Sequence, residues 1–426
     1  MPGHASVRPA RVLAHMTHPL LNRRQSVVVL LGAAAGLPLA LSDSTLQAWL
    51  TVGGVDVATI GVFSLVGLPY VFKFLWAPLV DRYQPGWPGR RRDWILCCQA
   101  VLAALLAWAG LADLAAGPLP WLALTALAIA AASATQDIAI DAYRTELLGE
   151  HERGFGAAVF VLGYRLGMLM AGAGALVLAD RIGFATTYLC LAALTVSGML
   201  ATVLAPALPA AIPPPASLRA AVSEPLTEFF GRDSAMALVG IIVLYKLGDA
   251  FAGRLTTNFL LAGLGFSLTD VGTIYKGMGL IATLAGALYG GALMSRLGLY
   301  RSLIVFAWLQ ALTNLGFCLL ALAGKSYLTM VAVIGLENLT GGMGTAAFVA
   351  LLMAVCNARY TATQFALLTA LASLARVLAG PPAGYLVDGI GWAWFFAVTF
   401  VLALPVIALL ASRRAVVEQL GSTPPP

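Results

Sequence analysis

The chain has 426 residues, of which 60% are hydrophobic and only 10% are charged. Soluble globular domains carry about 25% charged residues, so this composition excludes an ordinary soluble protein. The formal net charge of +6 does not indicate nucleic-acid binding, because the arginines are neither clustered on one polar face nor interleaved with aromatic residues. The composition therefore predicts an all-α membrane protein.

Apolar runs recur along the chain from Ser26 to Ser412. Each is long enough to cross a hydrocarbon layer of about 30 Å, at about 1.5 Å per helical residue. We predict twelve membrane-spanning helices from these runs. Their expected ranges, in chain order, are 26–50, 58–80, 93–113, 119–143, 155–179, 184–206, 235–262, 268–293, 299–323, 327–356, 361–387 and 391–411.

The basic residues lie mostly on one side of this predicted topology. The two tails and the even-numbered connections carry about 17 Lys and Arg, and the odd-numbered connections carry about 2. Cytoplasmic segments of membrane proteins are enriched in Lys and Arg. We therefore expect both termini to lie in the cytoplasm.

A long proline-rich connection, with Pro213, Pro214 and Pro215, separates the sixth and seventh spans. Such a composition is typical of a linker. We expect a tail at 1–25, a six-helix bundle at 26–206, a linker at 207–234, a second bundle at 235–411 and a tail at 412–426. Two six-helix halves are the outline of the major facilitator fold, whose substrate site lies between the halves, although other transporter classes share this topology.

The fourth predicted span ends in two carboxylates, Asp137 and Asp141. A charge at the centre of the membrane costs roughly 2.5–3.5 kcal/mol on insertion scales, so such residues face a protein interior or a watery cavity. A spacing of four residues places both carboxylates on one helical face. We predict that this face lines a transport path.

Other ionisable residues fall within the predicted spans at three depths. Isolated charges would be costly in lipid, so their number indicates a polar interior shared by both halves. The alternative is that they only tie neighbouring helices together. Lys73 and Arg165 lie at the depth of Asp137 and Asp141; Lys246, Asp249, Glu337 and Arg376 lie near mid-depth; and Asp43, Arg254 and Lys276 lie towards the periplasm.

The loop after the second span contains Asp81 and Arg82 followed by Arg90, Arg91 and Arg92. It resembles the loop with an Asp and an Arg in the major facilitator superfamily. Asp81 could pair with an arginine on an opposing helix when the cytoplasmic side is shut. Alternatively, the loop is solvated and only sets the topology.

Small residues should let the spans approach one another. Gly163, Gly167, Gly172 and Gly174 in the fifth span form expected packing faces. The glycines at 341, 342 and 344 and the pair Pro381–Pro382 should either loosen their helices for a rocking motion or allow close packing.

Several long polar strings resemble the AmpG-type muropeptide permeases of Gram-negative bacteria, a branch of the major facilitator superfamily. They occur in both halves in the expected order. The strings are GLPLALSDSTLQAWLT (36–51), YVFKFLWAPLVDRY (70–83), SATQDIAIDAYRTELL (133–148), GYRLGML (163–169), VLYKLGDAFA (243–252), GALYGGALMSRL (286–297), ENLTGGMGTAAFVALLM (337–353) and ATQFALLTAL (362–371).

This resemblance implies a permease of the cell inner membrane. It would import GlcNAc-1,6-anhydroMurNAc, with or without its peptide, from periplasm to cytoplasm. It also implies dependence on the proton motive force, a place in cell-wall recycling and an influence on β-lactam resistance. The expected partners are the anhydromuropeptide, protons and the bilayer, and we expect a monomer.

We assign expected roles to the intramembrane residues for proton symport by alternating access. Spans 1, 4, 7 and 10 line the central cavity in facilitator folds, and the cavity should therefore suit a large polar solute with carboxylates, hydroxyls and amides. The expected proton-coupling residues are Asp137, then Asp141, then Glu337; the substrate-binding residues are Gln47, Lys73, Gln136, Arg165, Tyr245, Lys246, Asp249, Asn338 and Arg376; and the gating residues are Asp43, Arg254, Lys276, Asp81 and Arg82.

Other functions remain as weaker alternatives. The chain shows no Ser/Lys dyad, intramembrane zinc motif or protease aspartate pair, so we do not expect an enzyme. The five cysteines have no metal-ligand spacing with a histidine, and we expect neither a metal nor a cofactor. A facilitator for another large polar or anionic solute, such as an oligosaccharide or an acyl-CoA-like anion, or a wall-fragment sensor that does not transport, would share the same features.

Overall fold

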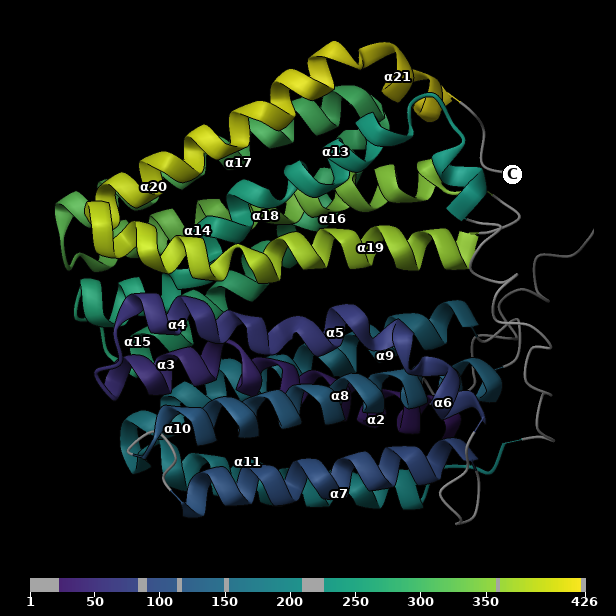
Figure 1. The fold of residues 1–426 in the computed structure, drawn as a ribbon, viewed down its shortest axis with the longest axis vertical. Coiled ribbons are helices and arrows are strands. Elements are labelled where there is room, and N and C mark those ends of the chain that lie inside the picture. The colour runs from purple at the N-terminus through teal and green to yellow at the C-terminus, as the bar shows by residue number, and fades with distance from the viewer. Residues whose placement is uncertain are drawn as a thin grey trace, which may run out of the picture.

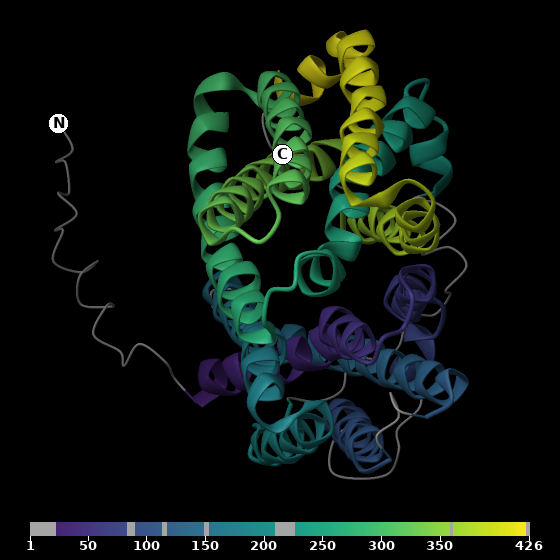
Figure 2. The same ribbon diagram turned by 90° about the vertical axis from the view of Figure 1, so that its left-hand side faces the viewer.

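A computed structural model describes residues 23–82, 90–112, 117–148, 153–208, 226–357 and 361–422. Within these ranges the chain is helical and contains no strand. Figure 1 shows two stacked layers of roughly parallel helices, one from each half of the chain. Figure 2, seen end-on, shows the first half below the second half.

The first half runs from Arg23 to the end of the sixth predicted span. Its α-helices are α2 (Arg23–Ser42), α3 (Ser44–Val52), α4 (Val57–Phe63), α5 (Leu68–Phe72), α6 (Ala77–Arg82), α7 (Arg90–Leu111), α8 (Leu119–Leu147), α9 (Arg153–Leu169), α10 (Ala175–Ile182) and α11 (Phe184–Val203). Two 3-10 turns, Ser64–Gly67 and Lys73–Leu75, connect α4 to α6, and a π-helical turn, Met170–Gly174, joins α9 to α10.

The second half begins at Ala235, directly after the predicted linker at 207–234. Its α-helices are α13 (Ala235–Tyr245), α14 (Leu247–Asn258), α15 (Leu268–Asp270), α16 (Gly279–Leu297), α17 (Leu299–Ala323), α18 (Tyr327–Val355), α19 (Thr361–Leu378), α20 (Gly380–Ser412) and α21 (Arg414–Ser422). Two π-helical segments, Phe259–Gly263 and Val271–Met278, flank α15.

Eleven helical stretches in the described residues are long and apolar enough to span a membrane. The last, Leu367–Ser412, has 46 residues and would be about 69 Å long if straight, which is twice the length that one span needs. The chain turns inside it at Gly391, whose φ of 73° and ψ of 169° suit a residue without a Cβ. This stretch therefore holds the last two predicted spans, and the fold has twelve spans in two six-helix halves.

Two of the spans are interrupted at charged residues. The first is broken between α2 and α3 at Asp43, and the seventh is broken between α13 and α14 at Lys246. Each break lies in the first span of its half. A break in a spanning helix is tolerated where its backbone lies inside the protein or lines a cavity.

Glycines set the closest helix contacts. A Cβ at Gly163 or Gly167 of α9 would overlap the carbonyl oxygens of Val29 and Ala33 of α2, which confirms this part of the predicted packing face. Gly172 and Gly174 lie in the π-helical turn, where a Cβ at Gly172 would meet open space. The prediction of a packing contact at Gly172 was therefore wrong.

Two of the three glycines named in the tenth span, Gly342 and Gly344, make close packing contacts, whereas a Cβ at Gly341 would meet open space, and none interrupts the helix. The helix α18 is continuous from Tyr327 to Val355. A Cβ at Gly342 would overlap the carbonyl oxygen of Thr283, and one at Gly344 would overlap the side chain of Gln310.

The apolar core differs between the two faces of the molecule. We call the face that carries Arg23 and Ser422 the terminal face and the opposite one the far face (Figure 1). Towards the far face, one continuous cluster contains residues from both halves, including Trp49 and Leu50 with Phe251, Leu255 and Phe259. Towards the terminal face, each half has a separate cluster.

Polar contacts also join the halves towards the far face. Asn258 Nδ2 donates to Thr51 Oγ1 at 2.9 Å, and Thr269 Oγ1 donates to an Asp180 carboxylate oxygen at 2.5 Å. Between α4 and α20, a Cβ at Gly61 would lie 2.6 Å from the Gly380 carbonyl oxygen. The halves are thus packed together at the far face.

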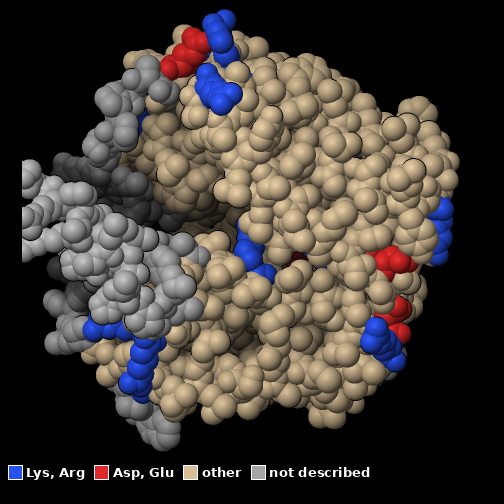
Figure 3. Space-filling model, turned by 180° about the vertical axis from the view of Figure 1, so that it is seen from behind, with Lys and Arg blue, Asp and Glu red and all other residues tan. Residues whose placement is uncertain are grey.

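The space-filling view shows the consequence at the other end. The surface is hollowed between the halves on the side of the terminal face, with a basic side chain at the inner end of the hollow (Figure 3). The molecule is therefore closed at the far face and open at the terminal face.

Candidate functional site

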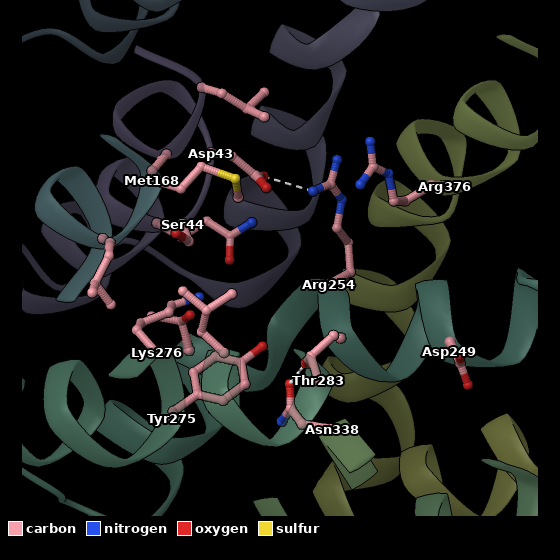
Figure 4. A pocket seen from close by; sticks show the side chains of 18 of the residues that line it. Asp43, Ser44, Met168, Asp249, Arg254, Tyr275, Lys276, Thr283, Asn338 and Arg376 are labelled. Carbon is pink, nitrogen blue, oxygen red and sulfur yellow. Dashed lines mark hydrogen bonds and ion pairs between the residues drawn. The ribbon is translucent and has the colours of Figure 1, made fainter. Parts of the chain in front are cut away.

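A cavity of about 340 Å³ lies between the two halves, next to the shared core. This volume is at the lower end of the range for ligand pockets, about 300–1,000 Å³. Its polar lining comes from the break between α2 and α3, from α3, α14, α16, α18 and α19, and from the π-helical segment Val271–Met278 (Figure 4). The lining includes Asp43, Ser44, Gln47, Asp249, Arg254, Thr257, Tyr275, Lys276, Thr283, Asn338 and Arg376.

An ion pair crosses between the halves at one wall of this cavity. Arg254 Nη1 lies 2.6 Å from Asp43 Oδ1, and Figure 4 shows the guanidinium of Arg376 beside that of Arg254. Asp43 stands at the break in the first span, where no regular helix holds its backbone. Of the two predicted gating cations, Arg254 and Lys276, it is Arg254 that pairs with Asp43.

Two further lining groups lie on the second half. Lys276 Nζ is 4.2 Å from the ring centroid of its neighbour Tyr275, which is a cation–π geometry. Thr283 Oγ1 donates to Asn338 Oδ1 at 3.1 Å, and Asn338 Nδ2 donates to Glu337 Oε2 at 2.9 Å. Amide, hydroxyl and basic groups thus share one wall.

Asp249 lines the cavity and is also paired along its own helix. Lys246 Nζ lies 3.2 Å from Asp249 Oδ2, which is the three-residue pairing that the sequence predicts. Lys246 itself is not in the cavity lining. Tyr245 is buried, with its hydroxyl donating to the Leu303 carbonyl oxygen at 3.3 Å and its ring stacked on Phe348.

The other predicted intramembrane charges of the first half do not line this cavity. Lys73 Nζ is 3.7 Å from Asp137 Oδ2, so these two groups, which the sequence places at the same depth, form an ion pair. Asp141 pairs instead with Arg144 at 3.0 Å. Arg165 is half-buried, and it makes no ion pair with another described residue.

Gln136 takes a different place from the one expected. Its side chain is fully buried, and its Nε2 donates to the Ala34 carbonyl oxygen at 2.9 Å. It ties α8 to α2 and does not line the cavity. Asp81 and Arg82 belong to α6, but their side chains lie outside the described residues.

The structure thus brings together four of the predicted substrate-binding residues, Gln47, Asp249, Asn338 and Arg376, with three of the predicted gating residues. Sequence reasoning missed four polar lining residues, Ser44, Thr257, Tyr275 and Thr283. Lys276, Leu280 and Thr283 all line the cavity, and their spacing of four and three residues is that of one helical face. That spacing was the signal that could have identified Thr283.

Comparison with known proteins defines the class. The family model of the Major Facilitator Superfamily matches residues 28–364, and the chain belongs to this superfamily of transporters. Two solved structures share the fold. A bacterial homologue of the human lysosomal transporter Spinster, in an inward-facing, unoccupied conformation, has a TM-score of 0.74 and 14% identity, with 96% of this chain and 100% of that one covered. The nucleoside transporter NupG has a TM-score of 0.69 and 16% identity, with 93% of this chain and 99% of that one covered.

The sequence relatives are more specific. The anhydromuropeptide permease of Escherichia coli K12 is 51% identical over 396 residues, which are 93% of this chain and 80% of that protein. A putative transporter of Rickettsia conorii, AmpG 4, is 34% identical over 90% of this chain and 94% of its own. This chain is therefore a multi-pass membrane transporter of the major facilitator type, and it is not an enzyme.

Proposed function

We propose that this protein is a permease of the cell inner membrane that imports anhydromuropeptides for cell-wall recycling. The sequence identity of 51% to the anhydromuropeptide permease of Escherichia coli supports the substrate. The structural observation that carries the proposal is the cavity between the halves, with its hydroxyl, amide and charged lining. A disaccharide with acetamido groups and a carboxylate-bearing peptide offers matching groups.

The transport mode that we propose is alternating access. The present geometry, with a shared core at the far face and separate cores at the terminal face, supports a state that is open to one side only. The basic tails and even-numbered connections support a cytoplasmic terminal face. In this proposal the state is inward-open, and the two bundles, 26–206 and 235–411, rock about the cavity as a monomer.

We further propose that a proton accompanies the substrate, with Asp137 as the first carrier and Asp141 and Glu337 as the others. Asp137 Oδ1 is buried without a hydrogen-bond partner, while Oδ2 faces Lys73. A group placed in this way can accept a proton when the halves move. One proton crossing about 100 mV supplies about 2.3 kcal/mol, which sustains an accumulation of roughly 50-fold.

Uptake of labelled anhydromuropeptide into proteoliposomes tests the function. We expect accumulation that a protonophore abolishes. Binding without accumulation would support a sensor, and accumulation of other polar solutes alone would support the alternative transporter. For the proton carrier, Asp137→Asn should lose the response to an imposed proton gradient, and retention of the full response would remove Asp137 from this role.

A further inference from the structure

Three basic side chains line the cavity from three different elements. Arg254 comes from α14, Lys276 from the π-helical segment Val271–Met278 and Arg376 from α19 (Figure 4). Among the described residues, only Arg254 of the three is paired with a carboxylate, that of Asp43. The contact of Lys276 is the Tyr275 ring. The lining of the cavity therefore carries more positive than negative charge.

The neighbouring groups do not remove this excess. Asp249, the other carboxylate in the lining, is held by Lys246 at 3.2 Å. The Arg254 side chain is only 9% exposed, and its Nε is buried without an acceptor. Buried cations without partners are costly, so this arrangement is explained best if an anionic ligand completes it.

We propose that Arg254, Lys276 and Arg376 form a subsite for the carboxylates of the peptide part of the substrate, and that Asp43 takes the place of one such carboxylate when the carrier is empty. This inference rests on the proposed function. The peptide of an anhydromuropeptide bears several free carboxylates, whereas its sugars are uncharged. The forked donors of arginine match the geometry of a carboxylate.

The position of Asp43 suits it for exchange with the substrate. Its side chain is 43% exposed, although its partner Arg254 is almost fully buried. It stands at the helix break between α2 and α3, so its carboxylate is held by one ion pair at a point without regular helical structure. When the far face closes, Asp43 can displace a substrate carboxylate from Arg254 and so promote release at the terminal face.

The volume of the cavity limits how much of the substrate it can hold, and this limit sets the orientation of the substrate in the proposal. A cavity of about 340 Å³ can hold only part of a disaccharide with its peptide, and the hollow continues towards the terminal face (Figure 3). In the proposal the peptide carboxylates bind the three basic side chains of the cavity. The sugars extend past Asn338 towards the hollow.

The test compares two substrates that differ only in charge: the anhydromuropeptide and the same molecule with its peptide carboxylates converted to amides. Uptake is measured in proteoliposomes for the wild type, Lys276→Gln, Arg376→Gln and the control Arg181→Gln, which removes an exposed cation at the end of α10 outside the cavity. Thermal unfolding of each purified variant in detergent checks its folding, and Arg376→Lys tests rescue.

We expect the wild type and Arg181→Gln to have a KM for the charged substrate roughly 10- to 100-fold lower than for the amide, the range of charge-assisted hydrogen bonds. Lys276→Gln and Arg376→Gln should lose most of this preference, and Arg376→Lys should regain part of it. A wild type that imports both substrates equally well would overturn the subsite and leave the proposed function intact. A wild type that imports neither would overturn the function itself.

Asp43→Asn tests the exchange separately. Without its competing carboxylate, KM for the charged substrate should fall and turnover should slow, because release is delayed, while uptake of the amide should change much less. If Asp43 acts only as a gate, its loss will change the uptake of both substrates by the same factor, and the exchange is then refuted.

Discussion

The far face and the terminal face of this transporter are built from the same twelve spans but differ in how the halves meet. At the far face, apolar side chains of both halves form one cluster, and the ion pair Asp43–Arg254 crosses between them. At the terminal face, each half keeps its own cluster, and the surface between them is hollowed (Figure 3). Opening the far face therefore requires the separation of a continuous apolar core, whereas the two clusters at the terminal face can remain intact when the halves move.

The first prediction has the largest expected effect: a covalent lock on the far face should abolish transport. The side chains of Thr51 and Asn258 meet across the halves at 2.9 Å. Both are replaced by cysteine in a background without the five native cysteines, and the pair is joined by a short thiol cross-linker. We expect the link to block uptake completely. A locked far face cannot accept substrate from that side. Uptake by the proteoliposomes before and after linking measures the effect.

The matched control joins two spans of one half. Thr202 Oγ1 donates to Gln99 Oε1 at 2.9 Å between α11 and α7, and cysteines linked there should leave rocking of the halves unaffected. Transport by the linked 51–258 protein, or equal inhibition by both links, would contradict a far face that must open.

A second prediction weakens the far face instead of locking it. Gly380→Val in α20 should favour the state in which the far face is open, because a side chain there would overlap Ser64 Oγ. Overpacking of this kind costs about 1–3 kcal/mol, which shifts a two-state equilibrium by roughly 5- to 150-fold. Labelling of a cysteine at the cavity residue Gly253 from the far side measures the shift.

Gly389→Val is the control for this prediction, because it lies in the same helix but a Cβ there would meet open space. It should leave the labelling unchanged. If Gly380→Val also leaves it unchanged, the contact between α4 and α20 does not hold the far face shut.

The spans themselves were predictable because the thickness of the bilayer sets their length and their apolar composition. The breaks at Asp43 and Lys246 were not, since neither position carries a proline or a glycine that would interrupt a helix. The tertiary arrangement decides them: Asp43 pairs with Arg254 across the halves, and Lys246 pairs with Asp249, which lines the cavity. Likewise, glycines that pack closely, as in α18, resemble in sequence those that adjoin open space, as at Gly172.

The sequence identified polar residues that belong to the site, but it did not show which of their side chains face the cavity. Polar groups in lipid must face inward, and this principle identified Gln47, Asn338 and Arg376, which line the cavity. The same principle selected Gln136, which is fully buried and bonded to Ala34. The rotation of each helix about its axis separates the two outcomes, and packing against neighbouring helices fixes that rotation.

A third prediction uses this pair of glutamines. Gln47→Ala should raise KM for anhydromuropeptide by roughly 2- to 12-fold, the range for the loss of one neutral hydrogen bond, because Gln47 lines the cavity. Gln136→Ala should lower the thermal stability and leave KM nearly unchanged, since it removes a tie between α8 and α2. A rise in KM for Gln136→Ala alone would place the substrate path along α8 instead.

The smallest predicted effect concerns a cluster that belongs to the terminal face of the second half alone. Glu228 accepts hydrogen bonds from Gln364 at 2.6 Å and Asn357 at 3.2 Å and pairs with Arg232 at 2.8 Å. Partial burial acts to raise the pKa of Glu228, but the hydrogen bonds from Gln364, Arg232 and Asn357 and the charge of Arg232 outweigh it, and the pKa is lowered from its usual 4.5.

Because the pKa is lower in the folded state, the stabilisation from Glu228 is present above the ordinary glutamate pKa and is lost as the pH falls through the lowered value. Wild-type protein in detergent should therefore lose this contribution to its thermal stability only as the pH falls from about 5 towards 3, and Glu228→Gln should lose less over that range. Glu418→Gln, which removes an exposed pair with Arg414, should behave like the wild type. Since the cluster joins elements of one half only, Glu228→Gln should leave labelling at position 253 unchanged, and a shift in that labelling would show that the terminal face also controls the balance between the two states.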